Sequence, residues 1–267
     1  TEDPFRVLAM GGNNDGQDVK PGMYGLELAS GHHPNDLARY RELIGMVGSG
    51  LPQNFFDAET GGLNLPLLSI LNVRYVIWPV YRYGGLPHGE VVMANSLGGN
   101  QVYEAVYEIP TLPRARLVGE AVVLSDDETV PYILSDSFRP DREIVLVDEY
   151  SGDLSGAPVD GDIQWVEKSP NRIRLQVQSG GEALLVLAEN WYPAWRAEVN
   201  GVEVPVLRAN HSLRAIPVPP GETEVEVFFD ARTLAGPFLL SLASLAIVFG
   251  VIFVRPKNQV LEVGEAA

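Results

Sequence analysis

The sequence predicts an α+β protein with a mixed α/β domain over residues 1–150, a small antiparallel β-sandwich over residues 162–230 and one C-terminal transmembrane helix over residues 234–254. Three observations lead to this prediction. Helical and extended patterns alternate in the first half of the chain, whereas apolar residues alternate with period two in the second half. An uncharged segment near the end is long enough to cross a bilayer.

The first domain is expected to mix short strands and helices. "FRVLAM" at residues 5–10 has the composition of a strand, and "NDLARYRELIGMV" that of a helix capped by Asn35 or Asp36. In that helix, apolar side chains at Leu37, Tyr40, Leu43 and Ile44 would share one face. The elements expected next are a helix over "LPLLSILN", strands over "VRYVIWPVY", "QVYEAVYEI" and "RARLVGEAVVL", a helix near "SDDETVPYIL" and a strand over "REIVLVDE".

The second domain is expected to be all β. The Gly-, Asp- and Ser-rich segment "EYSGDLSGAPVDGD" marks the boundary, with residues 151–161 as a linker. In "NRIRLQVQS", Ile173, Leu175 and Val177 alternate with polar residues, which indicates a strand with one buried face. Asn200-Gly201 between two extended segments predicts a tight hairpin. About seven short strands at this spacing favour a sandwich.

The segment "LAGPFLLSLASLAIVFGVIFV", Leu234 to Val254, carries no charge. Its 21 residues would span roughly 31 Å as a helix, which matches the hydrocarbon thickness of a bilayer. Arg255 and Lys257 follow it directly, so the positive-inside rule predicts a cytoplasmic tail over residues 255–267 and an extracytoplasmic location for residues 1–233. Because the chain begins at Thr1 without Met or a signal peptide, we expect an upstream segment to direct its translocation.

Composition excludes several function classes. A formal net charge of −16 argues against a nucleic-acid partner, because phosphate binding needs clustered Lys and Arg. The absence of cysteine removes disulfides, thiolate nucleophiles and Cys-type zinc sites.

The sequence offers no recognisable catalytic residue, metal site or cofactor motif. It lacks the nucleophile-elbow, phosphate-loop, dinucleotide and zinc-protease patterns. The neighbours His32 and His33 favour a loop over a metal site, and "NNDGQD" and "VDGD" favour turns over calcium loops. The acidic run Asp126-Asp127-Glu128 is typical of a helix start.

The stretch "ENWYPAWRAEVNG" at residues 189–201 gathers three aromatic rings. They are either a platform on which a sugar stacks, with Arg196 and Asn210 bonding its hydroxyls, or a plug for one end of the sandwich. We expect Trp195 to be mostly buried and Trp191 or Tyr192 to be partly exposed.

Several segments, taken in order, resemble the C-terminal region of YfhO-type bacterial membrane proteins. "WYPAWRAEVNG" is similar to that family's "YYPGW" and hairpin, and "RAN" and "IPVPPGETEVEVF" follow it here as similar segments do in the family. Upstream, "GHHPNDLARYRELI", "ILNVRYVI" and "TLPRARLV" are similar to family segments. The chain departs from the pattern at Ala194, where Gly is usual, and at Trp191 and His32, where Tyr is usual.

The resemblance implies a GT-C-class glycosyltransferase that takes sugar from a polyprenyl-phosphate donor and modifies a cell-envelope polymer outside the membrane. The family's presumed catalytic acid lies in an early loop, so no catalytic residue is carried over and this part is expected to be inactive alone. The implied partners are the bilayer, the lipid-linked sugar and a glycan acceptor. The expected substrate-binding residues are His33, Arg39, Tyr40, Arg41, Trp191, Tyr192 and Arg196.

Two other functions remain open from the residues alone. One is a membrane-anchored carbohydrate-binding or adhesion module without catalysis. The other, a free-standing hydrolase, is disfavoured because no site for it is recognisable.

Overall fold

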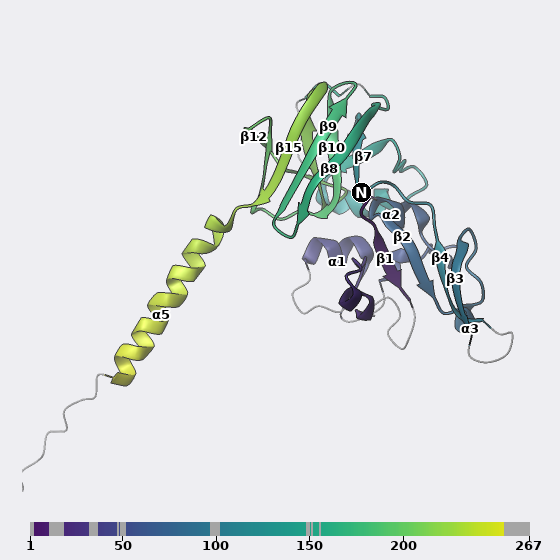
Figure 1. Cartoon of the computed structure of the whole chain (residues 1–267), viewed down its shortest axis with the longest axis horizontal. Helices are drawn as coiled ribbons and strands as arrows, with labels where there is room; N and C mark the ends of the chain where they lie inside the picture. Colours follow the sequence, from purple (N-terminus) through teal and green to yellow (C-terminus); the bar gives the residue numbers. More distant parts are fainter. Residues whose placement is uncertain are drawn as a thin grey trace, which may run out of the picture. The chain divides into compact units, whose positions relative to one another are not determined.

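A computed structural model describes residues 3–10, 19–31, 37–46, 48, 52–96, 102–147, 150, 152–154 and 156–253. The chain divides into two compact units, Thr1–Phe228 and Phe229–Ala267. The described residues of the first unit are mostly β-sheet, and the second contains one long helix (Figure 1). The expected α+β class agrees with this content.

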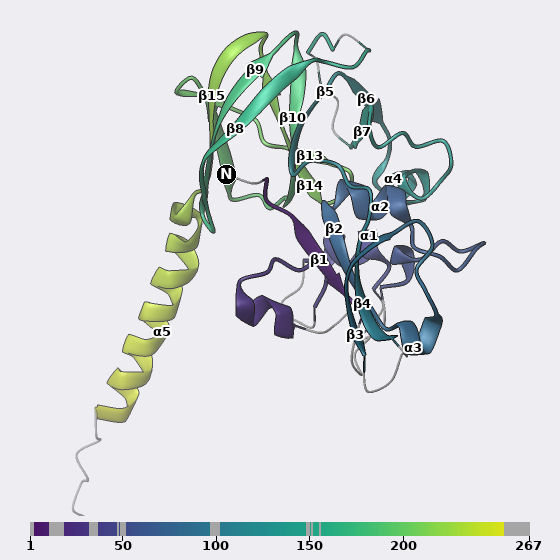
Figure 2. The same cartoon turned by 45° about the vertical axis from the view of Figure 1, so that its right-hand side comes forward.

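The first sheet has four strands in the order β1-β2-β4-β3 (Figure 2). Strands β1 and β2 are parallel, and β2, β4 and β3 follow as antiparallel neighbours. Their bounds are Arg6–Ala9 for β1, Val73–Trp78 for β2, Glu90–Ser96 for β3 and Val102–Glu108 for β4.

Short helices accompany this sheet. Helix α1, Ala38–Ile44, follows the N-cap residue Leu37 and is followed by the C-cap residue Gly45. The caps expected at Asn35 and Asp36 lie outside the described residues. Gly45 has a φ of 67°, and a Cβ there would lie 2.6 Å from Asn54, so the helix end requires glycine. The other helical segments are η1 Lys20–Tyr24, η2 Gln53–Phe55, α2 Leu65–Ile70, α3 Val80–Tyr83 and α4 Asp126–Ile133.

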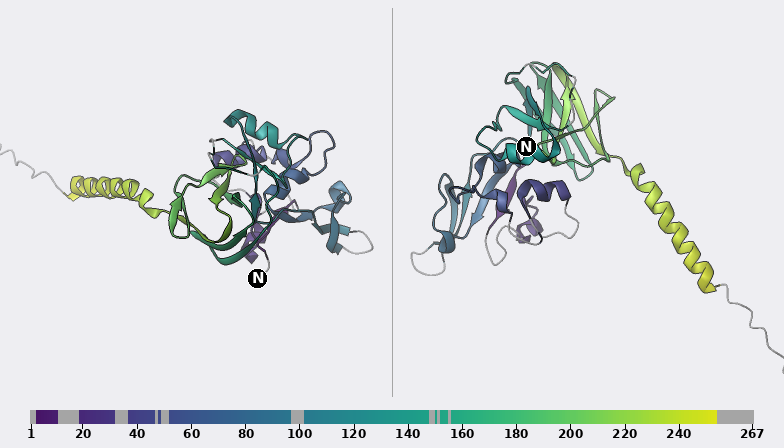
Figure 3. Two further views of the ribbon diagram at one scale, coloured as in Figure 1. Left: turned by 90° about the horizontal axis from the view of Figure 1, so that it is seen from above. Right: turned by 180° about the vertical axis from the view of Figure 1, so that it is seen from behind.

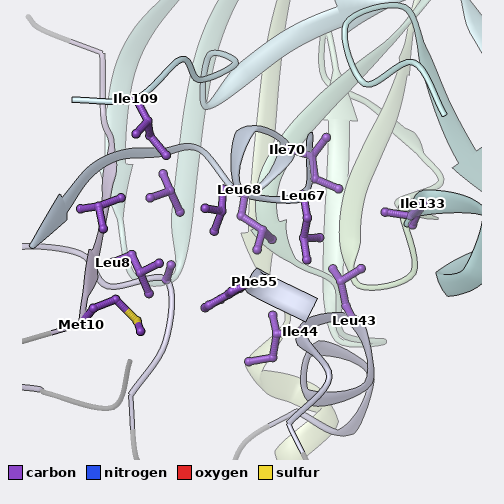
Figure 4. Close-up of a cluster of buried hydrophobic side chains, with 14 of the residues drawn as sticks. Leu8, Met10, Leu43, Ile44, Phe55, Leu67, Leu68, Ile70, Ile109 and Ile133 are labelled. Atoms are coloured by element: carbon purple, nitrogen blue, oxygen red, sulfur yellow. The ribbon is translucent and has the colours of Figure 1, made fainter. Parts of the chain in front are cut away.

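Apolar side chains from these elements form the first core (Figure 4). Phe55 lies at its centre, between the side chains of α1 and those of α2. The cluster also takes in Leu213 and Val145, which belong to the neighbouring sheet. The four-stranded sheet and the sandwich therefore share buried surface.

The sandwich consists of a six-stranded and a five-stranded sheet that lie face to face (Figure 3). The six-stranded sheet has the order β5-β10-β14-β13-β7-β6, and the five-stranded sheet the order β12-β11-β15-β9-β8. Strand bounds are β5 Ala115–Val118, β6 Glu120–Val123, β7 Glu143–Leu146, β8 Gly161–Ser169, β9 Arg172–Ser179, β10 Ala183–Asn190, β11 Trp195–Val199, β12 Val202–Val204, β13 Leu207–Ala209, β14 Leu213–Val218 and β15 Gly221–Phe229.

The expected domain boundary at residue 150 needs correction. Strand β5 pairs with β10, and β7 pairs with β13, so residues 115–146 belong to the sheet that also contains residues 183–218. The physical reason is that β10 is an interior strand of its sheet and most of its residues are buried. It pairs with β14 along one edge and needs β5 to pair with it along the other. Residues 161–229 contribute eight strands where about seven were expected.

Local patterns within the sandwich are confirmed. Strand β9 alternates buried and partly exposed residues, and Ile173, Leu175 and Val177 face the core between the sheets. The hairpin between β11 and β12 turns at Asn200 and Gly201, whose φ values of 52° and 75° suit a type I′ turn.

The second unit contains helix α5, Ala235–Phe253, preceded by the short η3, Ala231–Leu234. Among the described residues, it is the one helix that is long and apolar enough to cross a membrane. Its apolar side chains are exposed all around, as Phe238, Leu240 and Ile247 illustrate. Ser241 and Ser244 donate to carbonyls one turn back at 3.0 and 2.9 Å, which satisfies their hydroxyls inside the helix.

Candidate functional site

A cluster of buried charges lies where the first sheet meets the sandwich. Arg114 precedes β5 and is 1% exposed, and its Nη2 donates to Oε1 of Glu189 on β10 at 2.8 Å. Arg6 on β1 donates to the other oxygen of Glu189 at 3.4 Å and to the carbonyl of Leu71 at 2.9 Å. Arg114 also bonds Glu27. The carboxylate of Glu189 on β10 therefore connects β1 with the segment before β5, although these segments are far apart in the sequence.

The cations in this cluster lower the pKa values of the two carboxyl groups, Glu189 and Glu27. Burial opposes the ionised form of Glu189, but Arg114 and Arg6 outweigh it and lower the pKa of that carboxyl. Burial likewise opposes ionisation of Glu27, whose pKa is nevertheless lowered by its bond to Lys168 and by Arg114. Both carboxylates are therefore charged at neutral pH.

A cavity of about 380 Å³ opens beside this cluster. Glu189 and Arg214 line it from the six-stranded sheet, and Trp195 lines it from β11. The guanidinium carbon of Arg214 lies 3.5 Å from the centroid of the Trp195 ring, a cation–π contact. The remaining lining residues are Glu27, Lys168, Ser169, Pro170 and Ile173.

Arg214 is the least satisfied cation at this site. Its Nε donates to the carbonyl of Asn190 at 2.7 Å, whereas its Nη1 is buried and has no hydrogen-bond partner in the described part of the chain. Burial lowers its pKa to about 10, and the guanidinium still carries its charge at neutral pH. A buried, charged donor without a partner suits a site that receives an acceptor from outside.

A second group of polar side chains lies around the turn between β13 and β14. His211, which has a φ of 67°, is 2.8 Å from Glu42 on α1. Asp126 at the start of α4 accepts from Arg208 at 2.7 Å and from Arg39 at 2.7 and 2.8 Å. An open cavity of about 550 Å³ lies beside them. The second site therefore joins α1, α4 and the β13–β14 turn.

The expected binding residues on α1 fall at this second site. Arg39 is engaged by Asp126, and Arg41 lines the cavity while donating to the carbonyls of Met46 and Gly48. Tyr40 points elsewhere: its hydroxyl donates to the carbonyl of Ala29, and burial raises its pKa. His33 lies outside the described residues.

The aromatic residues divide between two environments. Trp191 is partly buried, and its Nε1 donates to the carbonyl of Val206 at 3.0 Å. Tyr192 is 48% exposed, as expected for one member of the group. Trp195 is partly buried, packs against the sandwich core and lines the first cavity. Arg196 bonds the carbonyl of Pro193 at 3.1 Å and is not among the residues lining that cavity.

Sequence reasoning missed the residues that carry the first site. Arg6, Arg114, Glu189 and Arg214 were assigned no role. One signal was available, since a charged residue inside an apolar strand, such as Arg214 in "LRAIPV", needs a buried partner. Nothing in the sequence indicates which partner it has.

No known family matches this chain. Comparison with models of protein families, with curated proteins and with solved structures finds no match. Within the described residues, no group of three or more His, Cys, Asp or Glu side chains is placed to hold a metal ion.

We predict that acid destabilises the first unit through this cluster. Glu189 has a pKa below its ordinary value of 4.5 in the folded chain, so its contribution to stability is present above that value and is lost as the pH falls through the folded-state pKa. Thermal unfolding followed from about pH 6 to about pH 3 should show a fall in Tm that Glu189→Gln flattens. The control Glu203→Gln alters an exposed carboxylate and should leave the slope unchanged. Equal slopes in both variants would contradict the prediction.

Proposed function

We propose that this chain is the glycan-binding, extracytoplasmic C-terminal part of a YfhO-like GT-C membrane glycosyltransferase. In this proposal residues 1–233 lie outside the cytoplasm, residues 255–267 lie inside, and the catalytic residues lie upstream. The donor is a polyprenyl-phosphate sugar and the acceptor a cell-envelope polymer. The ordered segments quoted above support this family assignment.

The observation that supports glycan binding best is the cavity beside Trp195. An indole ring and several hydrogen-bonding side chains, among them Ser169 and Glu189, line one small concave site. Sugars present apolar ring faces surrounded by hydroxyls, and this combination of aromatic and polar groups suits both. The volume of about 380 Å³ is at the small end of the range for ligand sites, which fits one sugar unit better than a long chain.

Helix α5 supports a role at the membrane surface. A polyprenyl-phosphate donor keeps its lipid in the bilayer, so sugar transfer takes place close to that surface. Only η3, Ala231–Leu234, separates the last sandwich strand from α5. The charge of Arg232 is met there by Asp230 at 2.9 Å, which lowers the cost of placing it beside an apolar helix.

The alternative is a membrane-anchored carbohydrate-binding or adhesion module. The same cavity and helix would serve it equally well. The upstream sequence discriminates the two, because many hydrophobic spans favour the transferase and a single signal peptide favours the module.

Transfer of labelled sugar from a polyprenyl-phosphate donor tests the proposal. The full-length protein should transfer sugar, and this chain alone should not. In the full-length protein, Trp195→Ala should lower kcat/KM by about tenfold, equivalent to about 1.4 kcal/mol of lost transition-state stabilisation. Trp165→Ala is the matched control, because Trp165 lies in the same sandwich on β8 and does not line this cavity. Turnover by the chain alone, or equal activity of both variants, would contradict the proposal.

A further inference from the structure

Cations outnumber carboxylates in and behind the cavity beside Trp195. Arg6, Arg114, Lys168 and Arg214 provide four positive charges, and Glu27 and Glu189 provide two negative ones. This local excess is unusual in a chain whose formal net charge is −16. A site that keeps uncompensated positive charge in acidic surroundings attracts anions.

The two carboxylates are already engaged. Glu189 accepts from Arg114 at 2.8 and 3.1 Å and from Arg6 at 3.4 Å. Glu27 is bonded by Lys168 and by Arg114. Neither carboxylate forms a hydrogen bond with Arg214 in the described part of the chain. Arg214 therefore bonds a single backbone carbonyl and contacts the Trp195 ring, while Glu189 meets its charge without a hydrogen bond.

We propose that this cavity binds the anionic group of a charged sugar, a carboxylate or a phosphate, with Arg214 as its main partner. The proposal rests on the proposed glycan-binding function and specifies its ligand. A planar guanidinium has donors spaced to bond two oxygens of such a group, and these charge-assisted bonds are stronger than neutral ones.

The cavity also explains why the ligand would be a sugar rather than a bare ion. Trp195 presents an indole beside Arg214, so the anionic group and the ring that carries it would be recognised by adjacent residues. Ser169 and Lys168, which also line the cavity, add donors for hydroxyls. The carboxylates of Glu27 and Glu189 also line the cavity and can accept hydrogen bonds from hydroxyls.

Calorimetric titration of the whole chain in detergent micelles tests the proposal. The ligands are D-glucuronate, glucose 1-phosphate, D-glucose and inorganic phosphate. We expect at least one charged sugar to bind about tenfold or more tightly than glucose, since one charge-assisted bond contributes about 1.4 kcal/mol or more. The preferred charged sugar distinguishes a carboxylate from a phosphate ligand. Phosphate alone should bind more weakly than glucose 1-phosphate.

Variants separate Arg214 from a general effect of charge. Arg214→Gln should abolish the preference for the charged sugar, and Arg214→Lys should retain part of it. The control Arg172→Gln removes a half-exposed arginine on β9 and should bind as the unaltered chain does. If Arg214→Gln does not fold, the unaltered chain tests the proposal: tighter binding of a charged sugar than of glucose supports the anion site, and equal binding contradicts it.

Each outcome bears on one proposal or on both. Equal binding of glucose and the charged sugars overturns the anion site and leaves glycan binding standing. A folded Arg214→Gln variant that keeps the preference also overturns it. Binding of no sugar at all overturns the anion site and argues against the glycan-binding function as well.

Discussion

Replacing Arg114 by methionine is expected to lower the free energy of unfolding by about 3–5 kcal/mol. Arg114 is 1% exposed and bonds Glu189, Glu27 and the side-chain oxygen of Asn72. Methionine fills much of the same space but leaves Glu189 with Arg6 alone, at 3.4 Å. The cost comes from a carboxylate that stays buried after its main positive partner has been removed.

Urea unfolding followed by tryptophan fluorescence measures this effect. The matched control is Arg142→Met, because the Arg142 side chain is 53% exposed and its nearest carboxylate, Asp141, lies 3.8 Å away. That change should cost less than about 1 kcal/mol, as exposed ion pairs do. If the two variants unfold at the same urea concentration, the buried cluster does not stabilise the fold.

Replacing Phe55 by alanine is expected to cost about 3–5 kcal/mol, the range for large-to-small changes of buried aromatic residues. Phe55 is fully buried although it lies in a three-residue 3₁₀ segment, and it packs between α1 and α2 (Figure 4). Helices α1 and α2 cannot move far into the cavity left by the ring, because backbone hydrogen bonds hold each helix in its own conformation.

Tyr24→Ala provides the comparison for Phe55→Ala. Tyr24 is also an aromatic residue in a 3₁₀ helix, but it is 85% exposed. Its replacement should change the unfolding free energy by no more than about 0.5 kcal/mol. Similar losses for both variants would show that burial of Phe55 is not what holds the first core together.

Local elements of this fold could be predicted from the sequence because short-range patterns determine them. The alternation in β9, the Asn200-Gly201 turn and the apolar run of α5 each depend on neighbouring residues. The start of α4 is a further case, since the acidic run Asp126-Asp127-Glu128 forms its first turn.

Long-range pairing could not be predicted in the same way. No local pattern indicates that β5, next to residue 114, pairs with β10 about seventy residues later, and so the sandwich was assigned too few residues. The first site is built from residues 6, 27, 114, 189 and 214, which only the folded chain brings together. Arg39 and Arg41 were singled out through the family resemblance, and their positions at the second cavity required the structure.

The pairing of β5 with β10 has a consequence for how this protein can be divided and how it folds. A fragment that began at residue 162 would lack β5, and residues 184–187 of β10 would lose their partners at 115–118. That exposed edge would be long and apolar, and such edges recruit strands from other molecules into aggregates. Strand β5 finds its partner only when β10, which ends at Asn190, has been synthesised, and β7 finds β13 only at Ala209. Residues 115–146 therefore remain without these partners, and exposed to aggregation, until that later part of the chain is made.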